Sequence, residues 1–266
     1  MRLIFVRACA IWVSALIATV PAETAQWEWE GVSRVVAIGD VHGAHDKLVS
    51  LLTAMELVDA DLAWSGGDTH LVFCGDLIDR GPRERPVMDL VRKLESEAER
   101  AGGRVHVVLG NHEVMNLTRD FRYVPPEGFA AFAVEEREED RAWGWKRFMA
   151  TAWTASGPPT REVFDESYPP GFFERMRAFG LDGEYGAWLL EKPAVVKVNG
   201  VLFVHGGLTE EVAALGLEEI NRRVQREVRS FMTHAVALEE EVRGVPANEA
   251  LVDGAPEIAE RGEGEA

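Results

Sequence analysis

The sequence Gly-Asp-Leu-Ile-Asp-Arg-Gly at residues 75–81 places two carboxylates and one guanidinium in a single short loop. The loop follows the apolar run Leu71 to Cys74, and a short apolar run closed by glycine is typical of a buried strand that ends in a turn. Open α/β sheets bind their ligands at the carboxyl ends of the strands. Acids beside an arginine at such a strand end therefore predict a site for metal ions and phosphate.

Three other polar loops follow apolar runs in the same way. These loops are Gly-Asp-Val-His-Gly at 39–43, Gly-Asn-His-Glu at 110–113 and His-Gly-Gly at 205–207. The last one follows a predicted hairpin over 194–204, because Asn-Gly between two apolar runs favours a type I′ turn. Asp40 and His42 are two residues apart, so in extended backbone both side chains point to one side and can bind a single cation.

Amphipathic helices are predicted between and after these loops. Apolar residues recur at helical spacing over 48–55, over 87–94 and over 217–231, where Phe231 closes the apolar face. Asp46 is the predicted N-cap of the first helix. Successive strand, loop and helix units favour an α/β sheet with one site along its edge.

The segment 119–192 carries no strand signal and is rich in acidic and aromatic residues. We interpret it as an inserted helical cap that covers the site. Aromatic residues such as Trp143, Trp145 and Phe148 are expected to form the cap's own core, in preference to a ligand-stacking role.

The composition limits the classes of partner. With 266 residues, of which 47% are hydrophobic, the chain can bury a full core. Its net charge of -17 repels polyanions, so nucleic acid and anionic membranes are not expected partners. Cys74 is the only cysteine beyond Cys9, and we expect it to fill the core.

Residues 1–22 have the pattern of a signal peptide. Arg2 and Arg7 precede an apolar stretch over 8–20, and small residues end the segment at Ala22. The sequence therefore predicts an exported protein, periplasmic in a bacterium, with no stable membrane insertion after cleavage. The alternative is an uncleaved membrane anchor, but the apolar stretch is shorter than the roughly 20 residues that a span needs.

Five donor side chains stand at the predicted strand ends: Asp40, His42, Asp76, Asn111 and His205. This mixture of oxygen and imidazole donors suits divalent cations such as Mn, Fe, Zn or Co. A carboxylate such as Asp76 can bridge two ions ~3.5 to 4 Å apart, which can hold a hydroxide for in-line attack on phosphorus. Arg80 can bind phosphate oxygens, and His112 can protonate the leaving oxygen.

The four motifs, in this order, resemble those of the phosphoprotein phosphatase branch of the calcineurin-like metallophosphoesterases. The Asn-Leu pair at 116–117 and Phe-Arg-Tyr-Val at 121–124 are similar to the bacterial Shewanella-like phosphatases. The resemblance implies an α/β fold in which helices flank a two-sheet β-sandwich, with the metal pair at its top.

The same resemblance implies a role for each site residue. Asp40 and His42 would bind the first metal ion, Asp76 would bridge, and Asn111 and His205 would bind the second. Arg80 would bind the substrate phosphate. His112 would be the proton donor, held in place by Asp79.

The chain departs from the family pattern after His205. The family uses a further histidine on a later strand, whereas this chain offers only His234, which is expected on a helix surface. We therefore expect a weak second metal site and an incomplete second sheet. The expected domain covers 23–243, with the cap insertion at 119–192 and a flexible acidic end at 244–266.

The leading functional prediction is metal-dependent hydrolysis of phosphomonoesters on a phosphorylated protein, a peptide or a small phosphoester. One alternative is a dinucleotide-polyphosphate hydrolase, because such enzymes share the Gly-Asp and Asp-Arg-Gly motifs. The other is a catalytically weak module that binds metal and phosphate, because the last metal-ligand histidine is missing.

Overall fold

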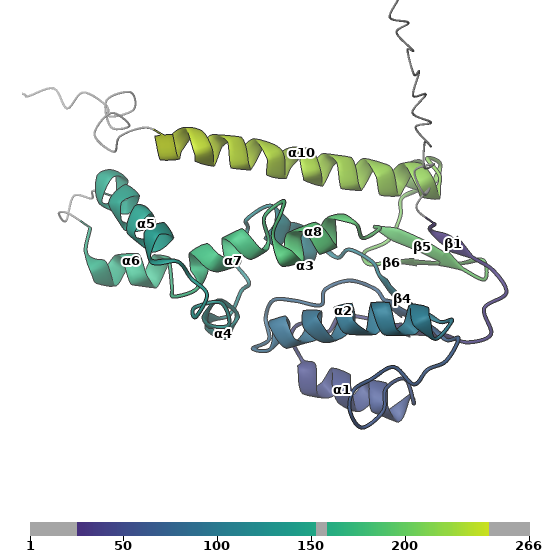
Figure 1. The fold of residues 1–266 in the computed structure, drawn as a ribbon. Coiled ribbons are helices and arrows are strands. Elements are labelled where there is room, and N and C mark those ends of the chain that lie inside the picture. Colours follow the sequence, from purple (N-terminus) through teal and green to yellow (C-terminus); the bar gives the residue numbers. More distant parts are fainter. Residues whose placement is uncertain (1–25, 153–158, 245–266) are drawn as a thin grey trace, which may run out of the picture.

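The structure is a computed structural model that describes residues 26–152 and 159–244 (Figure 1). The predicted signal peptide at 1–22 and the acidic end beyond Gly244 lie outside these residues. The described strands are β1 (Glu28–Trp29), β2 (Val35–Ile38), β3 (His70–Phe73), β4 (Arg104–Val107), β5 (Val195–Val198) and β6 (Val201–Val204). The described helices are α1 (His45–Ala54), α2 (Glu84–Arg100), α3 (Asn111–Leu117), α4 (Pro126–Ala130), α5 (Glu138–Thr151), α6 (Arg161–Ser167), α7 (Phe172–Ala178), α8 (Glu184–Leu190), α9 (Glu210–Ala213) and α10 (Leu217–Gly244).

The first sheet has the order β2-β3-β4, and all its strands are parallel. The central strand β3 is buried along its whole length, which explains its uninterrupted apolar sequence. Helices α1 and α2 are the crossover connections, and they pack on the same side of the sheet (Figure 1). Because the strands are in register, their carboxyl ends place the first three motifs side by side.

The second sheet has the order β1-β5-β6. The hairpin of β5 and β6 is the predicted one: its turn residues Asn199 and Gly200 have φ angles of 49° and 77°, as a type I′ turn requires. A small apolar cluster of Val72, Val108 and Val196 joins residues of both sheets, with Trp29, Val35, Cys74 and Phe203 packed against it. The two-sheet α/β fold flanked by helices is therefore confirmed.

Two details of the helix predictions are wrong. Helix α1 begins at His45 with Ala44 as its N-cap, so Asp46 lies inside the first turn, where it pairs with Arg83. On α10 the residue Phe231 is 52% exposed, whereas the neighbouring Met232 is buried. The buried apolar residues of α10, Ile220, Val228 and Met232, lie on one i, i+4 row, which is inclined to the helix axis, and Phe231 lies outside that row.

The described part of the segment 119–192 consists of helices joined by turns and irregular stretches. It contains α4 to α8, and its aromatic rings pack mostly against one another. The ring of Phe164 lies 5.3 Å from that of Trp145 and 5.5 Å from that of Phe148. These contacts are consistent with a core within the segment, and whether the segment limits access to the site remains a prediction. None of the described helices combines the length and apolarity that a bilayer crossing requires.

Candidate active site

Asp76 lies at the centre of the site, where the ends of β2, β3, β4 and β6 meet. Its Oδ2 is 3.3 Å from Nε2 of His205 and 3.6 Å from Nε2 of His42. Asp40 Oδ2 is also 3.6 Å from Nε2 of His42, and Asn111 Oδ1 is 3.0 Å from Nε2 of His205. The structure thus brings together all five donor residues that the sequence suggested.

Backbone carbonyl groups fix the orientation of two of the histidines. Nδ1 of His42 lies 2.9 Å from the carbonyl oxygen of Ile78, and Nδ1 of His205 lies 2.8 Å from that of Cys74. With Nδ1 held in this way, Nε2 of each ring faces Asp76. Carbonyl partners of this kind commonly orient histidine ligands in metal sites.

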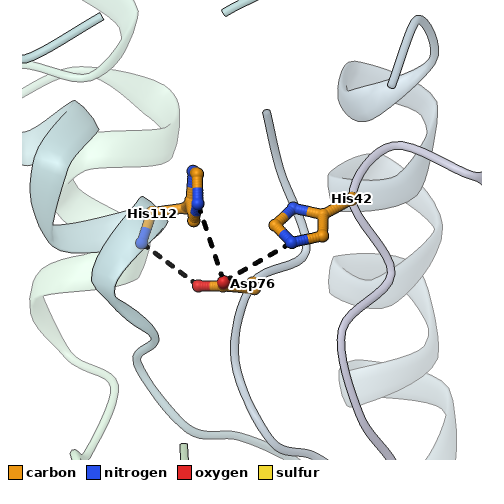
Figure 2. A group of neighbouring side chains, drawn as sticks. All are labelled: His42, Asp76 and His112. Atoms are coloured by element: carbon orange, nitrogen blue, oxygen red, sulfur yellow. Dashed lines mark hydrogen bonds and ion pairs between the residues drawn. The ribbon is translucent and has the colours of Figure 1, made fainter. Parts of the chain in front are cut away.

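His112 also approaches Asp76, and Figure 2 shows its ring next to that of His42, with both rings above the carboxylate in this view. Nε2 of His112 is 3.8 Å from Asp76 Oδ2, and the two imidazole rings are 4.8 Å apart. Nε2 of His42 and Nε2 of His112 are both buried without a hydrogen-bond partner in the described part of the chain. Buried polar atoms without partners are uncommon, and these two face the same carboxylate.

The donor set fits divalent cations. Two groups of side chains have ligand atoms within 4.8 Å of one another: His42, Asp76 and His112, and Asp40, Asp76 and His205. Atoms that share one cation at 2.0 to 2.2 Å are themselves ~3 to 3.5 Å apart, close to the separations found here. Asp76 belongs to both groups and is therefore placed to bridge.

The loop at 75–81 holds an unusual backbone conformation. Asp76, Asp79 and Arg80 have positive φ angles of 53°, 65° and 64°. Residues other than glycine rarely adopt positive φ angles, and such backbone strain persists only where the surrounding structure enforces it. Gly75 has a φ of 91°, and a Cβ on it would lie 2.7 Å from the backbone nitrogen of Gly110.

Two buried carboxylates hold this loop in place. Glu113 accepts hydrogen bonds from the backbone N–H groups of Asp76, Leu77 and Gly110, at 2.8, 2.8 and 2.9 Å. Burial raises the pKa of the Glu113 carboxyl, while these backbone donors oppose the shift. Glu84 accepts from the N–H of Asp79 at 2.8 Å.

His112 is paired with Asp79, as the resemblance implied: its Nδ1 lies 2.7 Å from Asp79 Oδ2. Nδ2 of Asn116 donates to both oxygens of Asp79, at 3.0 and 3.1 Å. Oδ1 of Asn116 accepts from Nη2 and Nε of Arg175, at 2.7 and 3.2 Å. The guanidinium of Arg175 also binds the carboxylate of Glu84.

Arg80 stands at the exposed rim of the site. Its backbone N–H donates to the carbonyl of Tyr123 at 2.9 Å, and its guanidinium lies 5.6 Å from the centre of the Tyr123 ring. Tyr123 is 46% exposed, and the centre of its ring lies 5.1 Å from the centre of the His112 ring. The ring of Tyr123 is therefore a common neighbour of Arg80 and His112.

Sequence reasoning assigned no role to four residues that organise the site: Glu84, Glu113, Asn116 and Arg175. Glu113 and Asn116 belong to quoted motifs, and Asn116 follows His112 at the i+4 spacing of a shared helix face. Glu84 and Arg175 lie outside the motifs, and Arg175 is 91 residues from its partner Glu84. His234 lies exposed on α10, as its context in the sequence predicted.

A family model described as calcineurin-like phosphoesterase matches residues 33–253. Shewanella-like protein phosphatase 2 of Arabidopsis thaliana is 36% identical over 223 residues, which are 79% of this chain and 55% of the relative. A symmetrical bis(5'-nucleosyl)-tetraphosphatase of Salmonella paratyphi A is 38% identical over 78 residues, 29% of this chain and 22% of the relative.

Among solved structures, the cold-active protein-tyrosine phosphatase of a psychrophilic Shewanella species is similar, with a TM-score of 0.58 and 29% identity. The match covers 77% of this chain and 52% of that protein. The chain spans about half the length of the relatives that it matches most broadly. The motifs, their places at the strand ends and the match over most of the chain lead to one conclusion: this protein belongs to the calcineurin-like phosphoesterase family.

Proposed function

We propose that the protein is a metal-dependent phosphomonoesterase that acts on phosphorylated proteins or peptides. The observation that carries this proposal is the position of Asp76 in a member of the phosphoesterase family. Its Oδ2 lies 3.6 Å from Nε2 of His42 and 3.3 Å from Nε2 of His205, one histidine of each proposed ion site. Family membership supports phosphoester hydrolysis, and the names of the phosphatase relatives support a protein substrate.

The residues that would hold the cations are those whose donors converge on Asp76. Asp40 and His42 would hold one ion, Asn111 and His205 the other, and Asp76 would bridge. Mn, Fe and Zn all suit this mixture of oxygen and imidazole donors. Two such ions supply an activated water nucleophile and neutralise charge on the phosphate.

The remaining tasks belong to the chain's own side chains. Arg80, exposed beside Tyr123, would bind two phosphate oxygens through its planar fork of N–H donors. His112 would give the proton on Nε2 to the leaving oxygen, because its Nδ1 is engaged by Asp79. Asp79 would hold the imidazole in that orientation throughout the reaction.

A test of the bridging role is hydrolysis of p-nitrophenyl phosphate in the presence of Mn²⁺. Asp76→Asn should abolish most of the turnover and lower the metal content measured by elemental analysis. Asp68→Asn is the matched control, because Asp68 is exposed and binds the hydroxyl of Ser33 outside the site. Turnover that Asp76→Asn leaves at the wild-type level would contradict the assignment of Asp76.

A second candidate is hydrolysis of dinucleotide polyphosphates, which the local similarity to the Salmonella enzyme favours. Product analysis separates the two activities. Incubation with a phosphopeptide and with a dinucleotide tetraphosphate at equal concentration should release phosphate from the first and leave the second intact. The net charge of -17 favours the phosphopeptide, which is the less anionic of the two substrates.

A third candidate, a metal-binding module with weak activity, differs in its metal content. Elemental analysis after dialysis should find two ions per chain if the enzyme proposal holds, and one ion per chain if the module is the correct description.

We also propose export, with cleavage after Ala22. N-terminal sequencing of the protein from fractionated cells tests this, and an intact N-terminus in the membrane fraction would instead indicate an anchor.

A further inference from the structure

The carboxylate of Asp79 lies in a chain of hydrogen bonds that begins in the helical segment 119–192. Arg175 of α7 binds Asn116 of α3, Asn116 binds Asp79, and Asp79 binds His112. None of these four side chains is exposed to solvent. Water therefore cannot easily replace a missing member of the chain.

We propose that Asn116 and Arg175 are positioning residues that fix the orientation of the Asp79–His112 pair, so that α7 is part of the catalytic apparatus. This inference rests on the proposed function, in which His112 protonates the leaving oxygen. It goes beyond the motif residues because Arg175 lies outside every motif quoted above.

The argument begins with the direction of each hydrogen bond. A guanidinium has donors only, so the end of the Asn116 amide that faces Arg175 must be its carbonyl oxygen. The amide NH₂ is then left to face Asp79, whose ionised carboxylate only accepts. Asp79 in turn accepts from Nδ1 of His112, which leaves Nε2 facing Asp76 and the substrate side.

Arg175 is itself held by its surroundings. Its guanidinium lies 4.7 to 5.9 Å from the centres of four aromatic rings, those of Phe121, Phe129, Phe132 and Phe179. Its charge is compensated by Glu84, the same carboxylate that accepts from the N–H of Asp79. The guanidinium and the backbone of the 75–81 loop therefore share one partner, which ties α7 to the candidate site.

A purely structural network would also be buried and well connected. The two roles differ in how substitutions respond to the leaving group. Phenol, with a pKa of about 10 like the tyrosine side chain, leaves poorly without a proton, whereas p-nitrophenolate leaves readily. Loss of positioning should therefore slow phenyl phosphate more than p-nitrophenyl phosphate, whereas a loss of folded protein would slow both equally.

The experiment compares Asn116→Leu and Arg175→Lys with the wild type on both substrates. Asn116→Leu removes the donors to Asp79 but keeps the branched shape of the side chain, and Arg175→Lys keeps the buried charge but removes the planar fork. We expect kcat on phenyl phosphate to fall about ten- to a hundredfold, with a much smaller loss on p-nitrophenyl phosphate. Should the leucine variant not fold, Asn116→Ser, which retains a donor, and Arg175→Lys carry the comparison.

Asn221→Leu is the matched control for a buried asparagine. Asn221 is also fully buried, but it binds the backbone of Ala194 and Val195 instead of a site residue. This variant should lower the melting temperature and leave the ratio of the two kcat values unchanged. Equal ratios in Asn116→Leu, Arg175→Lys and Asn221→Leu would overturn the inference.

The variant His112→Asn separates the inference from the proposed function. If His112→Asn loses activity equally on both substrates, the proposed proton donation by His112 is wrong. If His112→Asn slows phenyl phosphate more than p-nitrophenyl phosphate while Asn116→Leu and Arg175→Lys slow both equally, proton donation stands and the positioning role fails. The inference is supported when the single variant Asn116→Leu slows phenyl phosphate more than p-nitrophenyl phosphate. In the double variant with His112→Asn, the substitution Asn116→Leu should then cause no further loss.

Discussion

Nδ1 of His112 lies 2.7 Å from Oδ2 of Asp79, and neither side chain is exposed to solvent. The contact determines which face of the imidazole is available, because Nδ1 is occupied and Nε2 faces Asp76. It also joins two of the sequence motifs, since Asp79 follows β3 and His112 lies in the first turn of α3, the helix after β4. The pair is therefore the most direct place to test the proposed chemistry.

Asp79→Asn should lower kcat by about 10²- to 10⁴-fold while the metal content stays unchanged. The amide of the variant offers NH₂ to His112, because the NH₂ of Asn116 takes its oxygen, and the imidazole is then held in the other tautomer. The measurement is kcat on phenyl phosphate, whose leaving group needs the proton, together with elemental analysis. Asp89→Asn on α2, whose carboxylate binds Tyr185, is the control that should retain activity.

Gly75→Ala should be more destabilising than Gly31→Ala. Both glycines have positive φ angles, 91° and 73°, but only a Cβ at Gly75 would contact other atoms, 2.7 Å from Gly110 and 2.9 Å from His205. Strain of the backbone alone costs about 1 kcal/mol, so Gly31→Ala gives the baseline. Urea unfolding measures both values, and equal losses of stability would show that the close approach to Gly110 is unimportant.

The lowered pKa of the buried His106 predicts that the protein loses stability in acid. Its pKa is lowered from 6.5 to about 3, first because burial penalises the imidazolium and then because His70 and Arg104 repel it. Between these two values the unfolded chain holds a proton that the folded chain lacks. The free energy of unfolding should therefore fall as the pH drops through this range, by up to about 1.4 kcal/mol per pH unit from this group.

The variant His106→Gln isolates that contribution. Glutamine can still bind the ring of His70, which lies 3.0 Å from His106, but it does not titrate. Urea unfolding at pH 7 and pH 5 should show a shallower pH dependence for His106→Gln than for the wild type. His234→Gln on the exposed surface of α10 should keep the wild-type dependence, and a variant at His106 that also keeps it would count against the assignment.

Divalent cations should stabilise the fold, because their proposed ligands come from loops at the ends of both sheets. A ligand at a hundredfold its dissociation constant adds about 2.7 kcal/mol to the free energy of unfolding. We expect Mn²⁺ to raise the melting temperature and a chelator to reverse the effect. Asp76→Asn should lose most of this shift, whereas the same shift in the variant would point to binding elsewhere.

The strands and the loops that follow them could be predicted because each is encoded locally. The apolar runs before Asp40, Asp76 and Asn111 are short and end in glycine, and the register of parallel strands then aligns their ends. The turn at Asn199 and Gly200 was predictable for the same reason, since it depends on two adjacent residues.

Arg175 could not be predicted in this way. Its partners Glu84 and Asn116 are distant in the sequence, and an arginine on a short helix is usually exposed. Only the tertiary packing of four phenylalanine rings makes a fully buried guanidinium evident. The exposed Phe231 is the converse case, because helical spacing does not reveal at what angle α10 crosses its neighbours.

The carboxylate of Glu113 receives the N–H groups of Asp76, Leu77 and Gly110, which belong to loops after two different strands. Withdrawal of this one carboxylate would release all three amide hydrogens together. Their exchange with solvent deuterium should therefore proceed through one common opening, with closely similar free energies at all three positions. The loops after β3 and β4 would then open and close as one dynamic unit.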